Sequence, residues 1–291
     1  MAYKVAVASG KGGTGKTTVA ANLFRHLSKQ EDTRVMLIDC DVEEPNDLLF
    51  FPAAVQAAQS SVARETPVID PSRCTYCRKC AEYCEFNAIL VIPPTRFAEV
   101  NSSLCHSCGA CSVACESDAI WVRDEEVGTI SRYETGAHAG VMEGRLKIGS
   151  SMQTHVIRSL KHHVQADQEI LILDAPPGTS CPVVETISDA DYIILVTEPT
   201  PFGLHDLKLM VSLARELHKP FGVVVNKASL GNREVYHFLE SEKIALLEEI
   251  PFSRSYAARY AEGQLFSKVP VAMEKAYRGL TRLILQNMEK A

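Results

Sequence analysis

The chain has little that would direct it to a nucleic acid or a membrane. Its 291 residues include 30 basic and 36 acidic side chains, so the formal net charge is -6, and no basic excess is available to bind a phosphate backbone. The sequence starts without the basic stretch and apolar core of a signal peptide, and no apolar run approaches the length of a membrane span. We therefore expect a cytoplasmic protein that neither binds nucleic acid nor inserts into a membrane.

Disulfide bonds are also not expected, although the chain contains ten cysteines. Eight of them lie between residues 74 and 115 of a sequence that is otherwise enzyme-like, with 46% hydrophobic and 23% charged residues. Such crowding would indicate disulfides in a small secreted protein, but here it predicts metal binding in a reducing compartment.

The alternation of apolar runs with helical patterns predicts an α/β fold. Strands are expected at residues 3–8, 34–38, 170–173, 192–197 and 221–225. Helices are expected at residues 16–28, 153–165, 203–217 and 271–291. Because the strands are continuous apolar runs, they indicate a mostly parallel sheet with helices on both faces.

A cysteine-rich segment interrupts this pattern at residues 67–123. A shift of 31 positions superposes one half of it on the other, which indicates a duplicated half-module. We therefore divide the chain into a discontinuous α/β domain, residues 1–66 and 124–291, and an inserted module, residues 67–123. Strands are expected at 128–133 and 145–148, on the path back to the main sheet.

Residues 10–18 have the composition of a phosphate-binding loop. The run Gly-Lys-Gly-Gly-Thr-Gly-Lys-Thr-Thr follows an apolar strand and begins a helix, which is the context that such a loop requires. Lys16 can reach the outer phosphates, and Thr17 can place its hydroxyl on Mg²⁺. The residues predicted to bind nucleotide here are Gly10, Lys11, Gly12, Gly13, Thr14, Gly15, Lys16, Thr17 and Thr18.

Acidic residues end two of the predicted strands. Asp39 and Asp41 follow the run at 34–38, and Asp174 follows the run at 170–173. Ligands bind at the carboxyl ends of parallel strands in such sheets. These three carboxylates are therefore candidates for a site near the phosphates.

Both cysteine runs have the x2, x2, x3 spacing of bacterial two-cluster ferredoxins. This resemblance implies two 4Fe-4S clusters. One would be held by Cys74, Cys77, Cys80 and Cys115. The other would be held by Cys105, Cys108, Cys111 and Cys84. Structural zinc is a weaker alternative, because zinc sites generally use paired Cys-x2-Cys arms.

Glu85 and Glu116 follow the fourth cysteine of each run, where the ferredoxin pattern usually has proline. Two carboxylates beside anionic clusters favour the oxidised state, so we expect low reduction potentials.

Together, these motifs resemble the MinD-superfamily P-loop ATPases that contain an inserted ferredoxin domain. The glycine loop with Lys11 is similar to the deviant Walker A loop of the MinD, ParA, Mrp and nitrogenase iron protein class, and the runs at 39–46, 174–181 and 197–206 belong to the same likeness. The resemblance implies an ATP-sandwich homodimer, or a heterodimer with a related ATPase. In that dimer Lys11 would reach the partner's nucleotide.

The same resemblance implies roles for the acidic residues. Asp174 would be the Walker B residue near Mg²⁺, with Asp39 supporting the water shell of the metal. Asp41 would position the attacking water, and Gly178 would sense the γ-phosphate.

A base-recognition element is also implied. Asn226 and Lys227 follow an apolar strand and resemble that element in the class, with Pro251 and Phe252 as a second wall for adenine. A simple strand-ending turn is the alternative, because turns commonly contain asparagine.

Cys181 and Cys40 lie outside the cysteine-rich segment. Cys181 has the offset from Asp174 of a dimer-bridging cluster ligand in the nitrogenase iron protein, but no cysteine lies between residues 115 and 181 to be the second ligand. We therefore interpret both as buried core cysteines. A thiol that meets its twin across the dimer is the alternative for Cys181.

Three functions are compatible with these features, and all include slow hydrolysis of ATP to ADP and phosphate. The first is ATP-gated electron transfer through two clusters to a redox partner. The second is a Mrp-like assembly or carrier ATPase that delivers iron-sulfur or related metal clusters to an acceptor protein. The third, positioning in the manner of MinD or ParA, is disfavoured because the chain has neither a basic patch nor a terminal membrane-targeting extension.

Overall fold

The computed structural model describes residues 2–30 and 33–290, and the chain divides into two compact units. Unit 1 comprises Met1–Gln59, Ile130–Arg145 and Ile157–Ala291, and unit 2 comprises Ser60–Thr129 and Leu146–Val156. The two ends of the predicted α/β domain, residues 1 and 291, lie outside the described residues. The segment 67–123 falls inside unit 2, which extends beyond it on both sides.

The described strands include a nine-stranded sheet in the order β11-β10-β9-β1-β8-β2-β7-β6-β3. Their bounds are β1 Tyr3–Ala8, β2 Val35–Asp39, β3 Val55–Ile69, β6 Ile120–Gly136, β7 Ala139–Leu146, β8 Ile170–Asp174, β9 Tyr192–Thr197, β10 Phe221–Asn226 and β11 Leu246–Ile250. β1 pairs in parallel with β8 and β9, β2 with β7 and β8, and β10 with β9 and β11. The fold is therefore α/β with a mostly parallel sheet, as predicted.

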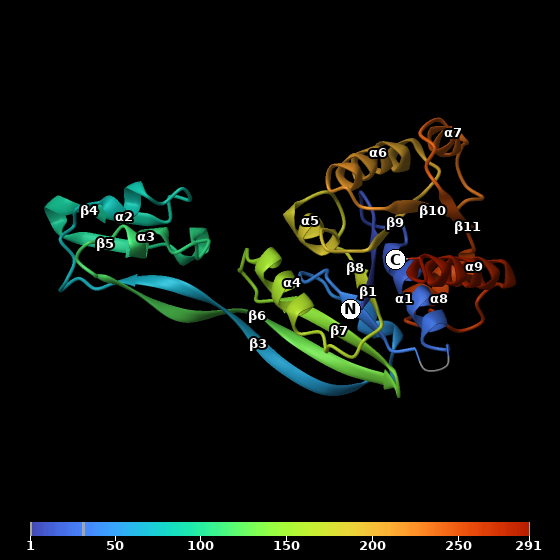
Figure 1. Ribbon diagram of the computed structural model, residues 1–291, viewed down its shortest axis with the longest axis horizontal. Helices are drawn as coiled ribbons and strands as arrows, with labels where there is room; N and C mark the ends of the chain where they lie inside the picture. The colour runs from blue at the N-terminus through green and yellow to red at the C-terminus, as the bar shows by residue number, and fades with distance from the viewer. Residues whose placement is uncertain (1, 31–32, 291) are drawn as a thin grey trace. The chain divides into compact units, whose positions relative to one another are not determined.

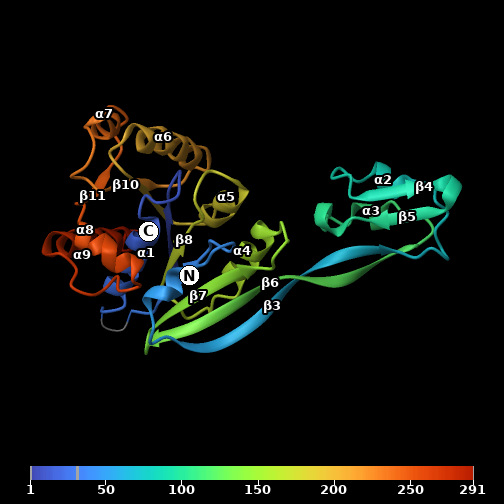
Figure 2. The same ribbon diagram turned by 180° about the vertical axis from the view of Figure 1, so that it is seen from behind.

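Helices cover both faces of the sheet in unit 1, with α1 and α9 on one face and α5 and α6 on the other (Figure 1 and Figure 2). The helices are α1 Lys16–Leu27, α4 Gln153–His162, α5 Cys181–Ile187, α6 Pro201–Glu216, α7 Glu234–Ser241, α8 Arg254–Ala261 and α9 Val271–Met288. Leu23 and Phe24 of α1 and Tyr277 and Leu280 of α9 belong to one buried core. The last helix therefore packs against the domain through its apolar face.

Continuous apolar runs predicted the central strands well. β1 and β9 have the predicted bounds, and β2, β8 and β10 differ from prediction by one residue. The strand predicted at 128–133 lies within β6, whereas the one predicted at 145–148 is strand only at its first two residues, because β7 ends at Leu146. The long strands β3 and β6 were not predicted at their full length. The acidic run at 124–126 breaks the apolar alternation of β6, which is mostly exposed up to that point.

The cysteine-rich half of unit 2 is a structural repeat as well as a sequence repeat. Its small helices α2 (Lys79–Glu82) and α3 (Ala110–Val113) are 31 positions apart. The strands β4 (Ile89–Ile92) and β5 (Phe97–Val100) form an antiparallel pair. Short 3-10 helices are η1 Asp47–Phe50, η2 Pro93–Thr95 and η3 Ser102–Leu104.

Among residues 2–30 and 33–290, none of the helices combines the length and the apolar character that a membrane span requires.

Candidate functional site

The glycine-rich loop lies between β1 and α1, where the sequence predicted it. Gly13 and Gly15 have φ angles of 79° and 93°, in the left-handed region that favours glycine. At Gly15 a Cβ atom would also approach the amide nitrogen of Asn226 to 2.1 Å. The loop therefore depends on glycine both for its backbone conformation and for close contact with β10.

Lys16, Thr17 and Asp174 form the buried centre of the site. Lys16 Nζ lies 2.7 Å from Asp174 Oδ1, and Thr17 Oγ1 donates a hydrogen bond of 2.7 Å to Asp174 Oδ2. Burial lowers the pKa of Lys16, but the charge and hydrogen bond of Asp174 outweigh it and raise that pKa above its ordinary value. The parallel pairing of β1, β8 and β2 brings these groups together at the carboxyl edge of the sheet.

Asp39 is held at the same edge by backbone N–H groups. Its carboxylate accepts hydrogen bonds from the backbone of Asp41 at 3.0 Å, Asn46 at 2.7 Å and Asp47 at 3.0 Å. Burial and the charge of Asp174 nevertheless raise the pKa of Asp39 to about 7. Burial also raises the pKa of Asp41, which is half-buried and lines the loop cavity defined below.

Asp47 was not among the predicted site residues. It is fully buried, and its carboxylate oxygens lie within 4.8 Å of oxygens of Asp39 and Asp174. Burial and the charges of Asp174 and Asp39 raise its pKa well above the ordinary value. No periodic pattern could have identified Asp47, because a turn separates it from Asp39, eight residues earlier.

Glu198 is a second residue that sequence reasoning missed. Lys11 Nζ lies 2.6 Å from Glu198 Oε1, and Lys227 Nζ lies 3.0 Å from Glu198 Oε2. Burial raises the pKa of Glu198, but the hydrogen bonds from the two lysines outweigh it and lower that pKa. The signal that could have identified it is its place directly after the apolar run of β9, at the carboxyl edge of the sheet.

The predicted base-binding residues meet the glycine loop. Asn226 Nδ2 donates to the Thr14 carbonyl at 2.7 Å, and Lys227 Nζ donates to the Gly13 carbonyl at 2.9 Å. We use "loop cavity" for the cavity of about 460 Å³ beside the loop. Of the predicted residues, it is lined by Lys11–Thr18, Asp41, Asn226, Lys227, Pro251 and Phe252. Residues that were not predicted also line it, among them Pro177, Ser253, Tyr256, Tyr260 and Met273.

Gly178 contacts the residue that follows β1. Its backbone N–H donates to the Ser9 carbonyl at 3.0 Å, and its φ angle is 97°. It does not line the loop cavity in the described structure, whereas its neighbour Pro177 does.

The eight clustered cysteines line two separate cavities. The Cys74 cavity is lined by Cys74, Cys77, Cys80 and Cys115. The Cys105 cavity is lined by Cys105, Cys108, Cys111 and Cys84. Each cavity therefore combines three cysteines of one repeat with the fourth cysteine of the other. The cysteines are not paired in disulfides in the described part of the chain.

The cysteine loops point backbone N–H groups at sulfur. The backbone N–H groups of Tyr76 and Ser107 donate to Cys74 and Cys105 Sγ at 3.4 Å, one such pair in each repeat. Tyr76 and Ser107 have positive φ angles of 56° and 57°, which is uncommon for residues other than glycine and is often maintained at binding sites. Each loop thus directs a backbone N–H group at the sulfur of its first cysteine.

One repeat has an additional anchor. Arg64 of β3 is buried, and its guanidinium donates to the carbonyls of Cys105 and Ser102, both at 2.7 Å. It also lies 3.1 Å from Glu125 Oε2. Arg64 therefore fastens η3 and the start of the Cys105 loop to the long strands of unit 2.

The two glutamates after the fourth cysteines are not equivalent. Glu116 pairs with Lys79 at 2.5 Å on the surface, and this pair raises the pKa of the lysine and lowers that of the glutamate. The lysine charge therefore offsets part of the predicted effect of Glu116 on a nearby cluster. The low reduction potential remains a prediction.

The two remaining cysteines differ from each other. Cys40 is buried as predicted, and burial raises the pKa of its thiol. The prediction that Cys181 is buried is wrong, because Cys181 is exposed. It is the first residue of α5, which buries Val183 and Ile187 instead.

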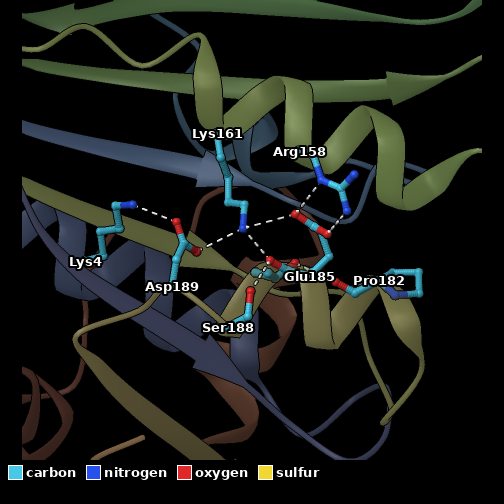
Figure 3. Close-up of polar contacts among 8 residues, drawn as sticks. Lys4, Arg158, Lys161, Pro182, Glu185, Ser188 and Asp189 are labelled. Carbon is cyan, nitrogen blue, oxygen red and sulfur yellow. Dashed lines mark hydrogen bonds and ion pairs between the residues drawn. The ribbon is translucent and has the colours of Figure 1, made fainter. Parts of the chain in front are cut away.

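A polar network stabilises α5, the helix that follows the Asp174 strand and the 175–180 loop. Figure 3 shows Lys161 of α4 reaching Asp189 at 2.9 Å and the backbone carbonyl of Glu185. Lys4 of β1 lies 2.6 Å from Asp189, and Arg158 of α4 lies 2.7 Å from Glu185. These contacts hold the end of α5 between β1 and α4.

Several known proteins resemble this chain in sequence or in fold. The family model of the CobQ/CobB/MinD/ParA nucleotide-binding domain matches residues 5–266. An uncharacterised protein of Methanocaldococcus jannaschii is 30% identical over 97% of this chain and 97% of its own length. An iron-sulfur cluster carrier protein of Pyrococcus furiosus is 26% identical over 86% of this chain and 72% of its own length.

The crystal structure of the cell division ATPase MinD of Pyrococcus furiosus has the same fold. It is similar with a TM-score of 0.57 and 18% identity, covering 100% of this chain and 99% of that one.

Proposed function

This chain belongs to the family of CobQ/CobB/MinD/ParA nucleotide-binding domains, and from that membership we propose that it hydrolyses ATP to gate electron transfer through two 4Fe-4S clusters. The observation that carries the proposal is the grouping of eight cysteines, four and four, into two cavities of a chain that also contains a phosphate-binding loop. A role in nucleotide binding alone would leave that grouping unexplained.

The nucleotide half of the proposal rests on groups at the carboxyl edge of the sheet. The loop residues 10–18 would bind the phosphates of ATP through backbone N–H groups, with Lys16 Nζ donating to an outer phosphate oxygen. Thr17, Asp39 and Asp174 would hold Mg²⁺, which neutralises phosphate charge when bound. Asp41, half-buried in the loop cavity, would orient the attacking water.

The base would bind at the other end of the loop cavity. Asn226 and Lys227 already contact the loop backbone, and Phe252 is 40% exposed with its ring free to cover a base. Pro251 lines the cavity beside it. Gly178, whose backbone N–H donates to the carbonyl of Ser9 directly after β1, would report the γ-phosphate by a shift of its loop.

Lys11 supports a dimer in this proposal. A lysine that reaches the partner's nucleotide must leave its own subunit, and Lys11 is only partly buried and pairs with Glu198. Glu198 would release Lys11 when two copies, or this chain and a related ATPase, close on ATP. Hydrolysis by the isolated chain is therefore expected to be slow.

The cysteine cavities fit 4Fe-4S clusters in the chemistry of their donors. Four thiols that are not in disulfides, with backbone N–H groups donating to sulfur, match cluster ligation by thiolates. A reducing compartment, as in the cytoplasm, would keep them available. The clusters would accept and release single electrons, and a redox partner would dock on unit 2.

Cluster assembly or delivery is the second candidate function. It is favoured by the similarity to an iron-sulfur cluster carrier protein of Pyrococcus furiosus and by the exposure of Cys77 and Cys108. In that case the clusters would be cargo and would leave for an acceptor protein. Positioning on a membrane or nucleoid is disfavoured, because it gives the eight cysteines no role.

One anaerobic experiment separates these functions. The reduced, cluster-loaded protein is mixed with a redox acceptor or with an apo-acceptor, with and without MgATP, while the cluster EPR signal and bound iron are followed. Clusters that stay bound and change their potential or oxidation rate with MgATP support gated electron transfer. Iron and sulfide that move to the apo-acceptor support a carrier, and a protein that binds no iron contradicts both.

A further inference from the structure

Asp47 is the most unusual buried group in the loop cavity region. It begins η1, its relative exposure is 0%, and neither carboxylate oxygen has a hydrogen-bond partner among the described residues. Buried carboxylates are normally paired or hydrogen-bonded, because an isolated buried charge costs much free energy. The described residues therefore supply no hydrogen-bond partner for the Asp47 carboxylate.

The carboxylates of Asp39 and Asp174 add further negative charge next to Asp47. Oxygens of Asp39, Asp47 and Asp174 all lie within 4.8 Å of one another, and all three side chains are buried. Lys16 is the paired cation in this group, and it lies on Asp174 at 2.7 Å. If all three carboxylates are ionised, one lysine leaves two negative charges uncompensated.

The available hydrogen bonds satisfy the other two carboxylates but not Asp47. Asp174 accepts from Lys16 and Thr17, and Asp39 accepts from three backbone N–H groups. One oxygen of Asp47 therefore lies in a group of carboxylate oxygens whose other two members belong to side chains held by hydrogen bonds. Several carboxylate oxygens at such spacing are the ligands that hard divalent cations prefer.

We propose that Asp47 completes a divalent-cation site that binds Mg²⁺ or Mn²⁺ in the absence of nucleotide, with Asp39 and Asp174 as the other carboxylate ligands. This inference rests on the proposed nucleotide site and is independent of the clusters. It differs from cation binding that depends on ATP phosphates, because here the chain supplies three carboxylates of its own. The cation then precedes the nucleotide in the order of binding.

The test is a titration with Mn²⁺ and no nucleotide. The cluster-loaded protein, kept oxidised under argon, is titrated while free Mn²⁺ is measured by EPR. We expect one Mn²⁺ per chain for the wild type and at least tenfold weaker binding for Asp47→Asn. Glu43→Gln is the matched control, because Glu43 is an exposed carboxylate in the same turn and should leave the affinity unchanged.

Thermal unfolding gives a second readout that does not depend on activity. In EDTA, Asp47→Asn should unfold at a higher temperature than the wild type, because the substitution removes a buried unpaired carboxylate. Added Mg²⁺ should raise the unfolding temperature of the wild type but not of Asp47→Asn. Equal responses of the two proteins would overturn the proposal.

The outcomes also separate this inference from the proposed function. A wild type that binds MgATP but no Mn²⁺ without nucleotide would overturn the cation site and leave the ATPase intact; bound protons would then neutralise Asp47. A wild type that binds neither Mn²⁺ nor a fluorescent ATP analogue with Mg²⁺ would instead contradict the nucleotide site itself.

Discussion

The loop cavity and the two cysteine cavities are assembled from the chain in opposite ways. In the loop cavity region, Lys16 meets a carboxylate 158 positions away, Lys11 meets one 187 positions away, and Asn226 contacts a carbonyl 212 positions away. In the cysteine cavities, all eight thiols come from residues 74–115. The first site depends on the register of the sheet, and the second depends on short loops and one duplication.

This difference predicts that a substitution in one region impairs that region and leaves the other intact. The largest effect is expected for Asp174→Asn, which leaves Lys16 and Thr17 without their shared carboxylate partner. ATP hydrolysis should fall by about 100-fold or more, as when a charged group is removed from a reacting centre. Bound iron per chain, measured on the same preparation, should not change. A parallel loss of iron would show that the cysteine cavities depend on the sheet edge.

Cys115→Ser tests whether each cysteine cavity takes its fourth cysteine from the other repeat. It removes one ligand from the Cys74 cavity although Cys115 belongs to the other repeat. We expect bound iron to fall to about half, with loss of the cluster held by Cys74, Cys77 and Cys80. Nucleotide binding should remain as in the wild type. Cys84→Ser is the matched variant and should remove the other cluster. The same EPR spectrum from both variants would contradict the assignment of Cys115 and Cys84 to opposite cavities.

A finer comparison lies between the two repeats, because only the Cys105 loop is shown to be held by Arg64. Arg64→Gln leaves two carbonyls and Glu125 without a cation, at a cost of about 2 kcal/mol to unit 2. A chelator should therefore remove iron faster from the Cys105 cavity than from the Cys74 cavity, as followed by EPR. Arg73→Gln is the control, because Arg73 pairs with Asp118 on the surface at 3.7 Å. Equal rates at both cavities would refute the anchoring role.

The smallest expected effect concerns the network around α5. Burial raises the pKa of Asp189, but hydrogen bonds from Lys4 and Lys161 outweigh it and lower that pKa. The folded state then binds its proton less tightly than the unfolded state, so the stabilisation is present at neutral pH and is lost as the pH falls below about 4. Asp189→Asn should cost about 0.5 kcal/mol, because the carboxylate is 40% exposed and screened by solvent.

The measurement for Asp189 is urea unfolding at pH 7 and at pH 3. The difference between wild type and Asp189→Asn should be full at pH 7 and smaller at pH 3, because the lowered pKa of Asp189 delays its protonation. Asp167→Asn is the control, because Asp167 is 50% exposed and pairs with an exposed arginine, and it should change little at either pH. A difference that grows at low pH would contradict the assigned shift.

Sequence patterns predicted the parts of both regions that depend on neighbouring residues. The apolar runs predicted β1, β8, β9 and β10, and the glycine run between residues 10 and 18 predicted the turn that begins α1. The 31-residue repeat predicted two matching loops, and the structure shows the corresponding positive φ angles at Tyr76 and Ser107. These features follow from periodicity and backbone sterics, which act over a few residues.

Other features depended on contacts that no local pattern records. Asp47 begins η1, eight residues after Asp39, where no pattern marks it. Glu198 directly follows the apolar run of β9, but only its contacts with Lys11 and Lys227 place it in the site. Arg64 lies in a strand whose exposed polar residues hid it from prediction. Cys181 was expected in the core and lies at the surface, because the buried side of α5 is set by packing on the sheet.

The sequence by itself therefore determined the central strands β1, β2, β8, β9 and β10, the phosphate loop and the composition of the cysteine loops. Tertiary structure alone decided which carboxylates face Lys16 and Lys11, and which repeat is held by a buried arginine. The physical reason is that the parallel register of β1, β8 and β2 places the ends of distant strands side by side. Burial there removes solvent screening, so charges far apart in the chain control each other's pKa.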